Sequence, residues 1–201
     1  MSLAPSPSQP DARPADADAT AAHPDWGWPV LRLGFRPFYL GAAAFALISI
    51  PLWLLMWSGM TAMQPTLAPL LWHAHEMVFG FALAVIVGFL FTAGRNWTNR
   101  PTPTGGALAA LAALWLAGRV LVLTPFPLAA AITSAAFPLA AAVALAKPFI
   151  AARNRRNYFF VGLLLLLAGA AAAVHGVQLG LLEAPAWVGI QLALDVVLFI
   201  V

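Results

Sequence analysis

The chain has 201 residues, of which 62% are hydrophobic and only 8% are charged. A soluble domain usually carries about 25% charged residues, so this composition excludes an ordinary soluble globular protein. The formal net charge is +3 and there is no cysteine, which excludes disulfides, thiolate metal ligands and cysteine nucleophiles, and we expect no nucleic-acid partner.

The N-terminal part of the chain precedes the first long apolar run. Residues 1–25 are rich in Ala, Pro, Ser and Asp and bury too little apolar surface to offset their ordering entropy, so we expect a disordered cytoplasmic arm. This arm lacks the apolar core of a signal peptide. Residues 26–37 combine tryptophans with arginines, which is typical of a segment that lies at the lipid headgroups.

Residues 38–201 contain six apolar runs and predict an all-α, polytopic membrane protein. A helix needs about 20 apolar residues to cross the hydrocarbon core. The expected transmembrane helices are residues 38–60, 70–92, 105–123, 126–146, 159–182 and 185–201. Because the last run is still apolar where the sequence stops, we expect a larger functional unit, formed with a missing C-terminal half or as a homo-oligomer.

The basic residues outside the expected helices predict the orientation. They precede the first helix or lie in the second-to-third and fourth-to-fifth connections: Arg32, Arg36, Arg95, Arg100, Lys147, Arg153, Arg155 and Arg156. These positions are all on one side of the membrane in an up-and-down bundle. The positive-inside rule therefore places them, and the N-terminus, in the cytoplasm of a bacterial inner membrane.

The second helix opens with three ionisable side chains, in the run LLWHAHEMVFGFALAVIVGFLFTAGRNW from Leu70 to Trp97. A charge inside a bilayer costs at least about 2.5 kcal/mol on insertion scales, so intramembrane ionisable residues indicate function. His73, His75 and Glu76 are therefore candidates for a metal, haem or proton site, against the simpler interpretation that they pair with lipid headgroups.

The predicted topology brings the other intramembrane polar groups to the same leaflet. Arg119 is near the outer end of the third helix, His175 near the outer end of the fifth, and Asp195 in the outer half to centre of the sixth. We expect one polar site that opens toward the periplasm. Arg119 would neutralise a carboxylate or a haem propionate, or snorkel to the interface; Asp195 would be a functional acid or a partner of Arg119.

Helical spacing leaves the identity of the bound group open. His73 and Glu76 are three residues apart and share a face, followed by the small residues Gly80, Ala84 and Gly88. His75 points to roughly the opposite side, so one undistorted helix cannot offer both histidines to one ion. Haem b with two axial imidazoles, one from this helix and one from His175, and a copper ion bound by imidazoles both remain possible.

The run WHAHEMVFGFALAVIVGFLFTAGRNWT, from Trp72 to Thr98, resembles the hallmark segment of the NnrS family. The run LGFRPFYLGAAAFA, from Leu33 to Ala46, is similar to the start of that family's first helix. The resemblance implies a polytopic membrane protein that contains haem and copper and is associated with denitrification and protection against nitric oxide. It also implies about twice as many membrane helices as this chain, which would make the chain an N-terminal half.

The leading hypothesis is thus a haem- and copper-binding inner-membrane protein of the nitric oxide stress response. Its expected ligands for haem or metal are His73, His75 and His175. Glu76 would belong to the metal site and orient an imidazole, and Arg119 would lie beside the cofactor's negative charge. Whether the protein is an enzyme, a sensor or a metal-handling protein stays open. The alternatives are half of a proton-coupled transporter, which uses Glu76, His175 and Asp195, and a structural membrane subunit.

Overall fold

The computed structural model describes residues 28–61, 63 and 65–200, which form helices and the short connections between them. The elements are η1 (Pro29–Leu31), α1 (Phe35–Trp57), α2 (Pro69–His75), η2 (Glu76–Ala82), α3 (Leu83–Thr98), α4 (Gly105–Leu121), α5 (Pro127–Ala151), η3 (Arg155–Asn157), α6 (Tyr158–Gln178) and α7 (Ala186–Ile200). Elements α2, η2 and α3 follow one another without a break. The expected disordered arm, residues 1–25, lies outside the described residues.

These elements confirm the predicted all-α class and the six apolar helices in the part of the chain that is described. Four helical stretches are long and apolar enough to cross a membrane: Phe35–Trp57, Pro69–Thr98, Pro127–Ala151 and Arg155–Gln178. The other two, α4 with 17 residues and α7 with 15, are shorter than the roughly 20 residues that span the hydrocarbon core. The helix composition is that of a multi-pass membrane protein.

Proline and glycine set several of the helix ends. Pro69 and Pro127 occupy the first turns of α2 and α5, where a missing backbone N–H costs nothing. Gly180 follows α6 with φ +70°, and the next residue, Leu181, donates its backbone N–H to Gly176 O at 2.8 Å. This is the usual way in which a left-handed glycine ends a helix. The second long helix continues to Thr98, beyond the expected end at residue 92.

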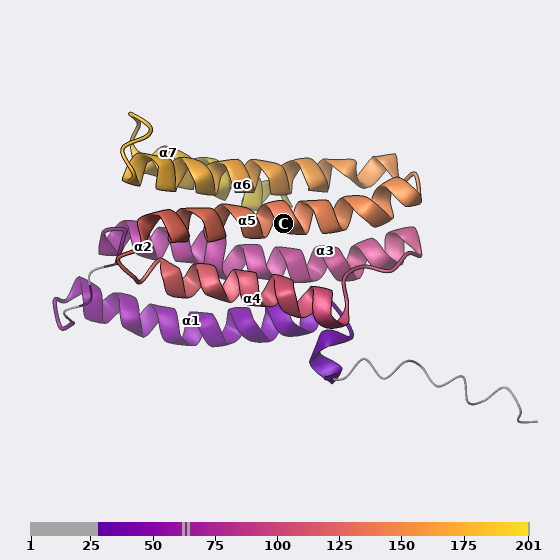
Figure 1. The fold of residues 1–201 in the computed structure, drawn as a ribbon, viewed down its shortest axis with the longest axis horizontal. Coiled ribbons are helices and arrows are strands. Elements are labelled where there is room, and N and C mark those ends of the chain that lie inside the picture. Colours follow the sequence, from indigo (N-terminus) through magenta and orange to yellow (C-terminus); the bar gives the residue numbers. More distant parts are fainter. Residues whose placement is uncertain (1–27, 62, 64, 201) are drawn as a thin grey trace, which may run out of the picture.

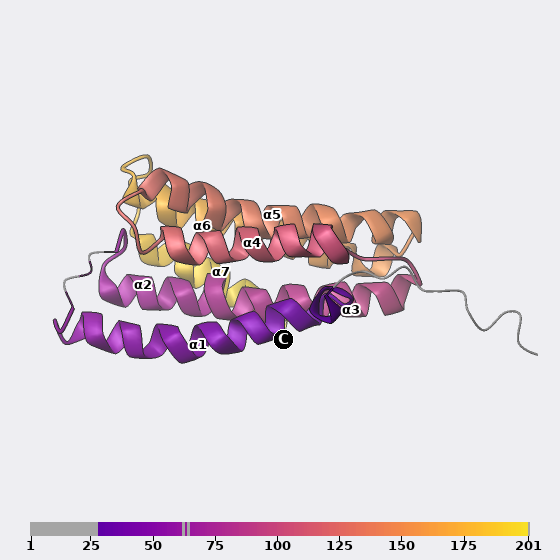
Figure 2. The same ribbon diagram turned by 60° about the horizontal axis from the view of Figure 1, so that its bottom comes forward.

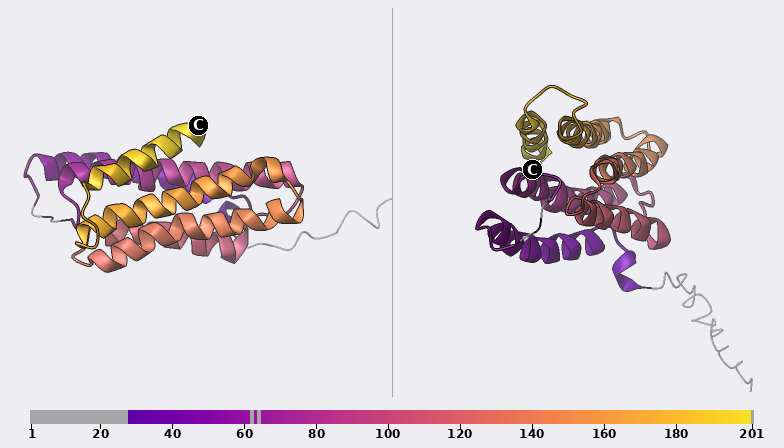
Figure 3. Two further views of the ribbon diagram at one scale, coloured as in Figure 1. Left: turned by 90° about the horizontal axis from the view of Figure 1, so that it is seen from above. Right: turned by 60° about the vertical axis from the view of Figure 1, so that its left-hand side comes forward.

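The helices run up and down with short connections, and α2–η2–α3 lies in the middle of the bundle. Helix α1 packs along α3 on one side, while α5 contacts α3, α4 and α6, and α7 packs mainly on α6 (Figures 1 and 2). In the central helix 67% of the most apolar stretch is buried, against 17% in α1. The right-hand view in Figure 3 shows α7 and α1 on different sides of the central helix. Of the ionisable residues on this helix, His75 and Glu76 are fully buried, whereas Arg95 near its end is exposed.

The two ends of the bundle differ in charge. The starts of α1, α4 and α6 and the ends of α3 and α5 lie together at one end (Figure 1), which we call the basic end because the arginines and the lysine of those connections are there. The starts of α2, α5 and α7 lie at the other end, which we call the histidine end. His73, His75 and His175 lie within the last or first turns at this end.

Small residues let α1 approach the central helix closely. A Cβ built on Gly80 would lie 2.5 Å from Phe45 Cε1, and one built on Gly88 would lie 3.1 Å from Phe38 Cβ. Both contacts are made by α1, and Ala84, between the two glycines, is fully buried. The small-residue stripe that the sequence indicates is thus the surface on which α1 packs, as small-residue interfaces do in membrane helices.

Candidate functional site

The site is built around the π-helical segment η2, which begins at Glu76. Its i→i+5 hydrogen bonding leaves backbone groups available to other partners, and π-helical segments occur frequently at functional sites. Here the indole Nε1 of Trp115 on α4 donates to Gly80 O at 2.9 Å. This bond joins the third helix of the bundle to the irregular part of the second.

Glu76 and Arg119 form an ion pair inside the bundle. The Arg119 NH1 nitrogen donates to both carboxylate oxygens of Glu76 at 3.0 Å, and the two side chains are 5% and 0% exposed. A buried charge without a partner costs several kcal/mol, so each member of this pair makes the burial of the other possible. The carboxylate that Arg119 neutralises is therefore that of Glu76.

The spacing of residues on α4 matches the spacing on η2. Glu76 and Gly80 are four residues apart, as are Trp115 and Arg119, and residues four apart stack on one face of a helix. Because the two segments run in opposite directions, Arg119 meets Glu76 while Trp115 meets Gly80. Two contacts one turn apart thus fix the register of α4 against η2.

His75 is oriented by the same carboxylate. Its Nδ1 lies 2.8 Å from Glu76 Oε1, and the imidazole is fully buried. A carboxylate oxygen accepts hydrogen bonds, so in this contact His75 Nδ1 carries the proton and donates it to Glu76 Oε1. The other nitrogen, Nε2, then carries a lone pair, and it is buried without a hydrogen-bond partner.

His175 of α6 lies beside His75. The two ring centroids are 5.0 Å apart and the rings meet edge to face, at an angle of 78°. His175 is 1% exposed, and neither of its ring nitrogens has a hydrogen-bond partner. Buried polar groups are normally hydrogen-bonded, so three orphaned nitrogens on two touching imidazoles require an explanation.

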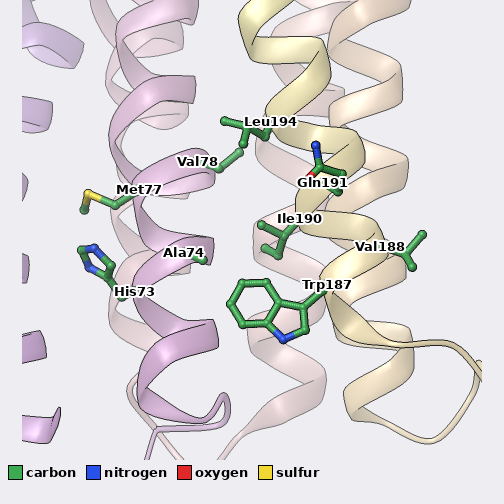
Figure 4. A pocket seen from close by; sticks show the side chains of 9 residues that line it. All are labelled: His73, Ala74, Met77, Val78, Trp187, Val188, Ile190, Gln191 and Leu194. Atoms are coloured by element: carbon green, nitrogen blue, oxygen red, sulfur yellow. The ribbon is translucent and has the colours of Figure 1, made fainter.

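His73 lies apart from this group. Its ring stacks on Trp53 of α1 with the centroids 4.1 Å apart, and its Nδ1 is buried without a partner. In Figure 4, His73 and Met77 point to the side of the helix away from α7. The two histidines thus point to different surroundings, as their helical spacing predicts. The same spacing groups Glu76 with His73 and not with His75, whereas in the structure Glu76 contacts His75.

Asp195 also lies outside the group. It is exposed on α7 and accepts a hydrogen bond from Gln191 Nε2 at 2.9 Å, whereas Arg119 is bound to Glu76. Among the described residues, no three side chains of the metal-binding types gather closely enough to hold an ion by themselves. The site that the structure assembles from the expected residues is thus His75, Glu76, Arg119 and His175.

Comparison with known proteins identifies the family. The family model for the NnrS protein matches residues 29–201. The chain belongs to the NnrS family. No curated protein and no solved structure matches it. In this NnrS chain the motif WHAHEM places His75 and Glu76 at the junction of α2 and η2, and Gly80 follows one turn later.

Trp115, Phe45 and Gly80 also belong to this NnrS site, although the sequence pattern alone does not predict their contacts. The i, i+4 pair of Trp115 and Arg119 on an otherwise apolar helix is a usable signal, since both side chains need polar partners in the membrane. The position of Gly80 one turn after Glu76 is another. Neither signal says which helix supplies the partner, because that depends on the packing of α4 against η2.

Gly80 provides a test of this packing. Replacing it with alanine is expected to lower the free energy of unfolding by about 1–3 kcal/mol, the usual cost of overpacking, because the new Cβ would lie 2.5 Å from Phe45 Cε1 and 3.0 Å from Glu76 Oε2. The matched control is Gly169→Ala, on the exposed side of α6, where a Cβ meets nothing within 4 Å. This control should be neutral or stabilising, since alanine is the better helix former by about 0.5–1 kcal/mol. Equal stability of the two variants would contradict the packing at Gly80.

Proposed function

We propose that this chain is a metal-binding protein of the bacterial inner membrane that acts in the nitric oxide stress response or in denitrification. The single observation that carries the proposal is the pair of buried imidazoles, His75 and His175, whose nitrogens have no partner in the protein. Membership of the NnrS family supports the physiological setting, through the association that the resemblance implies.

The separation of the two rings fits a shared metal ion. Imidazole nitrogens bind such ions at about 2.0–2.1 Å, and the ring centroid is about 1.1 Å further away, so two imidazoles at a tetrahedral angle have centroids about 5 Å apart. The observed separation is 5.0 Å. Imidazole suits copper, zinc, iron and nickel. Copper is the ion we propose, because the family resemblance implies it.

Haem fits this pair poorly. Two axial imidazoles lie on opposite sides of the iron, which puts the ring centroids more than about 6 Å apart, with the flat macrocycle between them. His75 and His175 touch edge to face at 5.0 Å, so no macrocycle fits between them. A haem in this protein would need at least one ligand from outside this pair.

The residues around the two imidazoles would orient the metal ligands and balance the charge beside them. Glu76 accepts the Nδ1 proton of His75 and so leaves Nε2 free as a ligand, which is how a carboxylate commonly orients a metal-binding histidine. Arg119 forms an ion pair with Glu76, so the charge of this carboxylate is balanced beside the two imidazoles. A bound copper ion would supply redox chemistry and would interact with a small ligand such as nitric oxide. Among the described residues no group of three or more His, Cys, Asp or Glu side chains that could hold a metal is found, so His75 and His175 are the protein ligands that we propose.

The orientation we propose follows from the basic end of the bundle. The positive-inside rule places that end, and the N-terminus, in the cytoplasm. The histidine end then lies toward the periplasm, and His75 and His175 lie in the outer half of the membrane. A small uncharged molecule such as nitric oxide reaches this depth through the lipid.

The transporter alternative has less support from the contacts. A proton relay through Glu76, His175 and Asp195 needs these groups to lie in series. Glu76 is held by Arg119 and His75, and Asp195 is exposed on α7 with its hydrogen bond to Gln191. A structural subunit without a metal gives no reason for unpartnered nitrogens in the core.

Metal analysis of the protein purified from membranes tests the proposal. We expect copper to co-purify with the wild-type chain, and the electron paramagnetic resonance spectrum of the oxidised protein to show coupling to imidazole nitrogens. A bacterial strain that lacks the protein should grow poorly with a compound that releases nitric oxide and should recover when the wild-type chain is restored. Folded protein that binds no transition metal under any loading condition would refute the metal site.

A further inference from the structure

Helix α7 divides into a buried stripe and an exposed stripe. Gly189, Ile190, Ala193, Val196 and Val197 are buried, and a Cβ on Gly189 would lie 2.7 Å from Val174 of α6. The opposite stripe, which we call the α7 outer face, consists of Val188, Gln191, Leu192, Asp195, Leu198 and Phe199, all exposed. Its residues recur at the three- and four-residue steps of one helix face.

The α7 outer face carries a carboxylate at a depth that lipid does not tolerate. Asp195 lies about 14 Å from the start of α7 at 1.5 Å per residue, close to half of the roughly 30 Å hydrocarbon thickness. Its side chain is too short to reach the interface. Ionisable groups inside membranes almost always face protein or water and pair with another group.

Among the described residues, the hydrogen bond that Asp195 accepts comes from a neutral side chain, which does not balance a carboxylate charge. Gln191 donates one hydrogen bond, at 2.9 Å, and a carboxylate has about four acceptor sites. Arg119, the cation nearest in depth, is buried and bound to Glu76. The remaining described arginines and the lysine lie at the basic end. The charge of Asp195 therefore has no cation within the described part of the chain.

A groove beside this face shows that α7 is incompletely covered. A cavity of about 560 Å³ separates α7 from α2 and η2 and is lined by Ala74, Val78, Trp187, Ile190, Gln191 and Leu194, with His73 and Met77 at its far edge (Figure 4). In Figure 3, α7 runs at an angle to α6. Gln191 belongs to both the groove and the outer face, so the two surfaces are continuous.

We propose that the α7 outer face binds a transmembrane helix that carries a lysine or arginine at the depth of Asp195. A second copy of this chain is the weaker candidate. Two copies inserted in the same direction would bring Asp195 against Asp195 across a two-fold axis, and like charges at that distance repel. Charge complementarity thus selects a basic helix, with Gln191 as an additional hydrogen-bonding group, since polar side chains join helices in bilayers.

The absence of cysteine allows a direct binding test. The variant Glu183→Cys carries a donor fluorophore in the exposed connection before α7, and the protein is placed in phosphatidylcholine vesicles. Acceptor-labelled peptides of leucine and alanine, long enough to span the membrane, carry a single central Lys, Leu or Glu. We expect energy transfer to report binding of the Lys peptide about five- to thirty-fold tighter than the Leu peptide, the range of one polar contact between membrane helices. The Glu peptide should bind no better than the Leu peptide.

Two substitutions on α7 complete the test. Asp195→Asn, which keeps the shape and the bond to Gln191, should bring the Lys and Leu peptides to within about twofold of each other. Leu192→Ala, on the same face, should keep the preference for the Lys peptide. Circular dichroism confirms that each variant is folded. Equal binding of the three peptides by the wild-type chain, a Lys preference that survives Asp195→Asn, or self-association of the chain that excludes the Lys peptide would each overturn the proposal.

Discussion

Replacing Arg119 with methionine is expected to lower the free energy of unfolding by about 3–5 kcal/mol, the cost of leaving one member of a buried ion pair uncompensated. Methionine keeps most of the volume but removes the donor that holds both oxygens of Glu76. The measurement is reversible unfolding of the purified protein in mixed detergent micelles, followed by circular dichroism. The effect is large because Glu76 is fully buried and cannot be solvated in place.

The double variant separates charge from packing. In Glu76→Gln with Arg119→Met, no buried charge is left, and the glutamine carbonyl still accepts the hydrogen bond from His75 Nδ1. We therefore expect the double variant to recover most of the loss, because replacing a buried pair by neutral groups is often close to neutral. The exposed Arg95→Met serves as the control and should change stability by less than about 0.5 kcal/mol. An Arg119→Met variant as stable as the wild type would rule out a buried ion pair.

The helices themselves are predictable from the sequence because each depends on its own composition. Runs of apolar residues of membrane length are sufficient to find six helices, and the placement of arginines is sufficient to bring one set of connections to the same end. The shifts at the boundaries have local causes. The second long helix extends to Thr98 because its polar last turn packs back on the bundle, where Gly94 and Thr98 are buried.

The candidate site is predictable from the sequence only in part. The position of each residue along its helix predicts that His75, Glu76, Arg119 and His175 lie near the same end of the bundle, but the same reasoning also includes His73 and Asp195, which lie apart from this group. The partner of Arg119 is not predictable, since it depends on which helices touch: α4 packs on η2, so Arg119 meets Glu76 rather than Asp195. A fixed rotation of 100° per residue describes a regular α-helix, so it does not predict the π-helical hydrogen bonding that begins at Glu76.

For the two histidines of the motif, helical spacing predicts their separation but not which of them contacts Glu76. Helical spacing predicts that His73 and His75 serve different surroundings, and they do: one stacks on Trp53 and the other lies against His175. The same spacing grouped Glu76 with His73. The carboxylate oxygens of a glutamate are three bonds beyond its Cβ, so a residue adjacent in sequence can form a hydrogen bond with them, as His75 does.

If His75 and His175 share one ion, substituting either should cost the protein most of its metal affinity. Loss of a residue that merely orients a ligand costs about 10–100-fold, so His75→Ala and His175→Ala are each expected to exceed that range. The metal affinity of each purified variant is measured by competition with a chelator of known affinity. The matched control is His73→Ala, which removes an imidazole two residues away on the same helix and should leave the affinity within about twofold of wild type.

The double variant decides whether the two histidines act on the same ion. Residues that share one partner give non-additive effects, whereas independent sites give effects that add. We expect His75→Ala with His175→Ala to bind metal no more weakly than the worse single variant, because the first substitution already dismantles the site. Additive losses of affinity would mean that the two histidines belong to separate sites. Unchanged affinity in both single variants would mean that the unpartnered nitrogens of His75 and His175 do not bind the metal. The proposed function therefore depends on the two imidazoles that the fold brings together from α2 and α6.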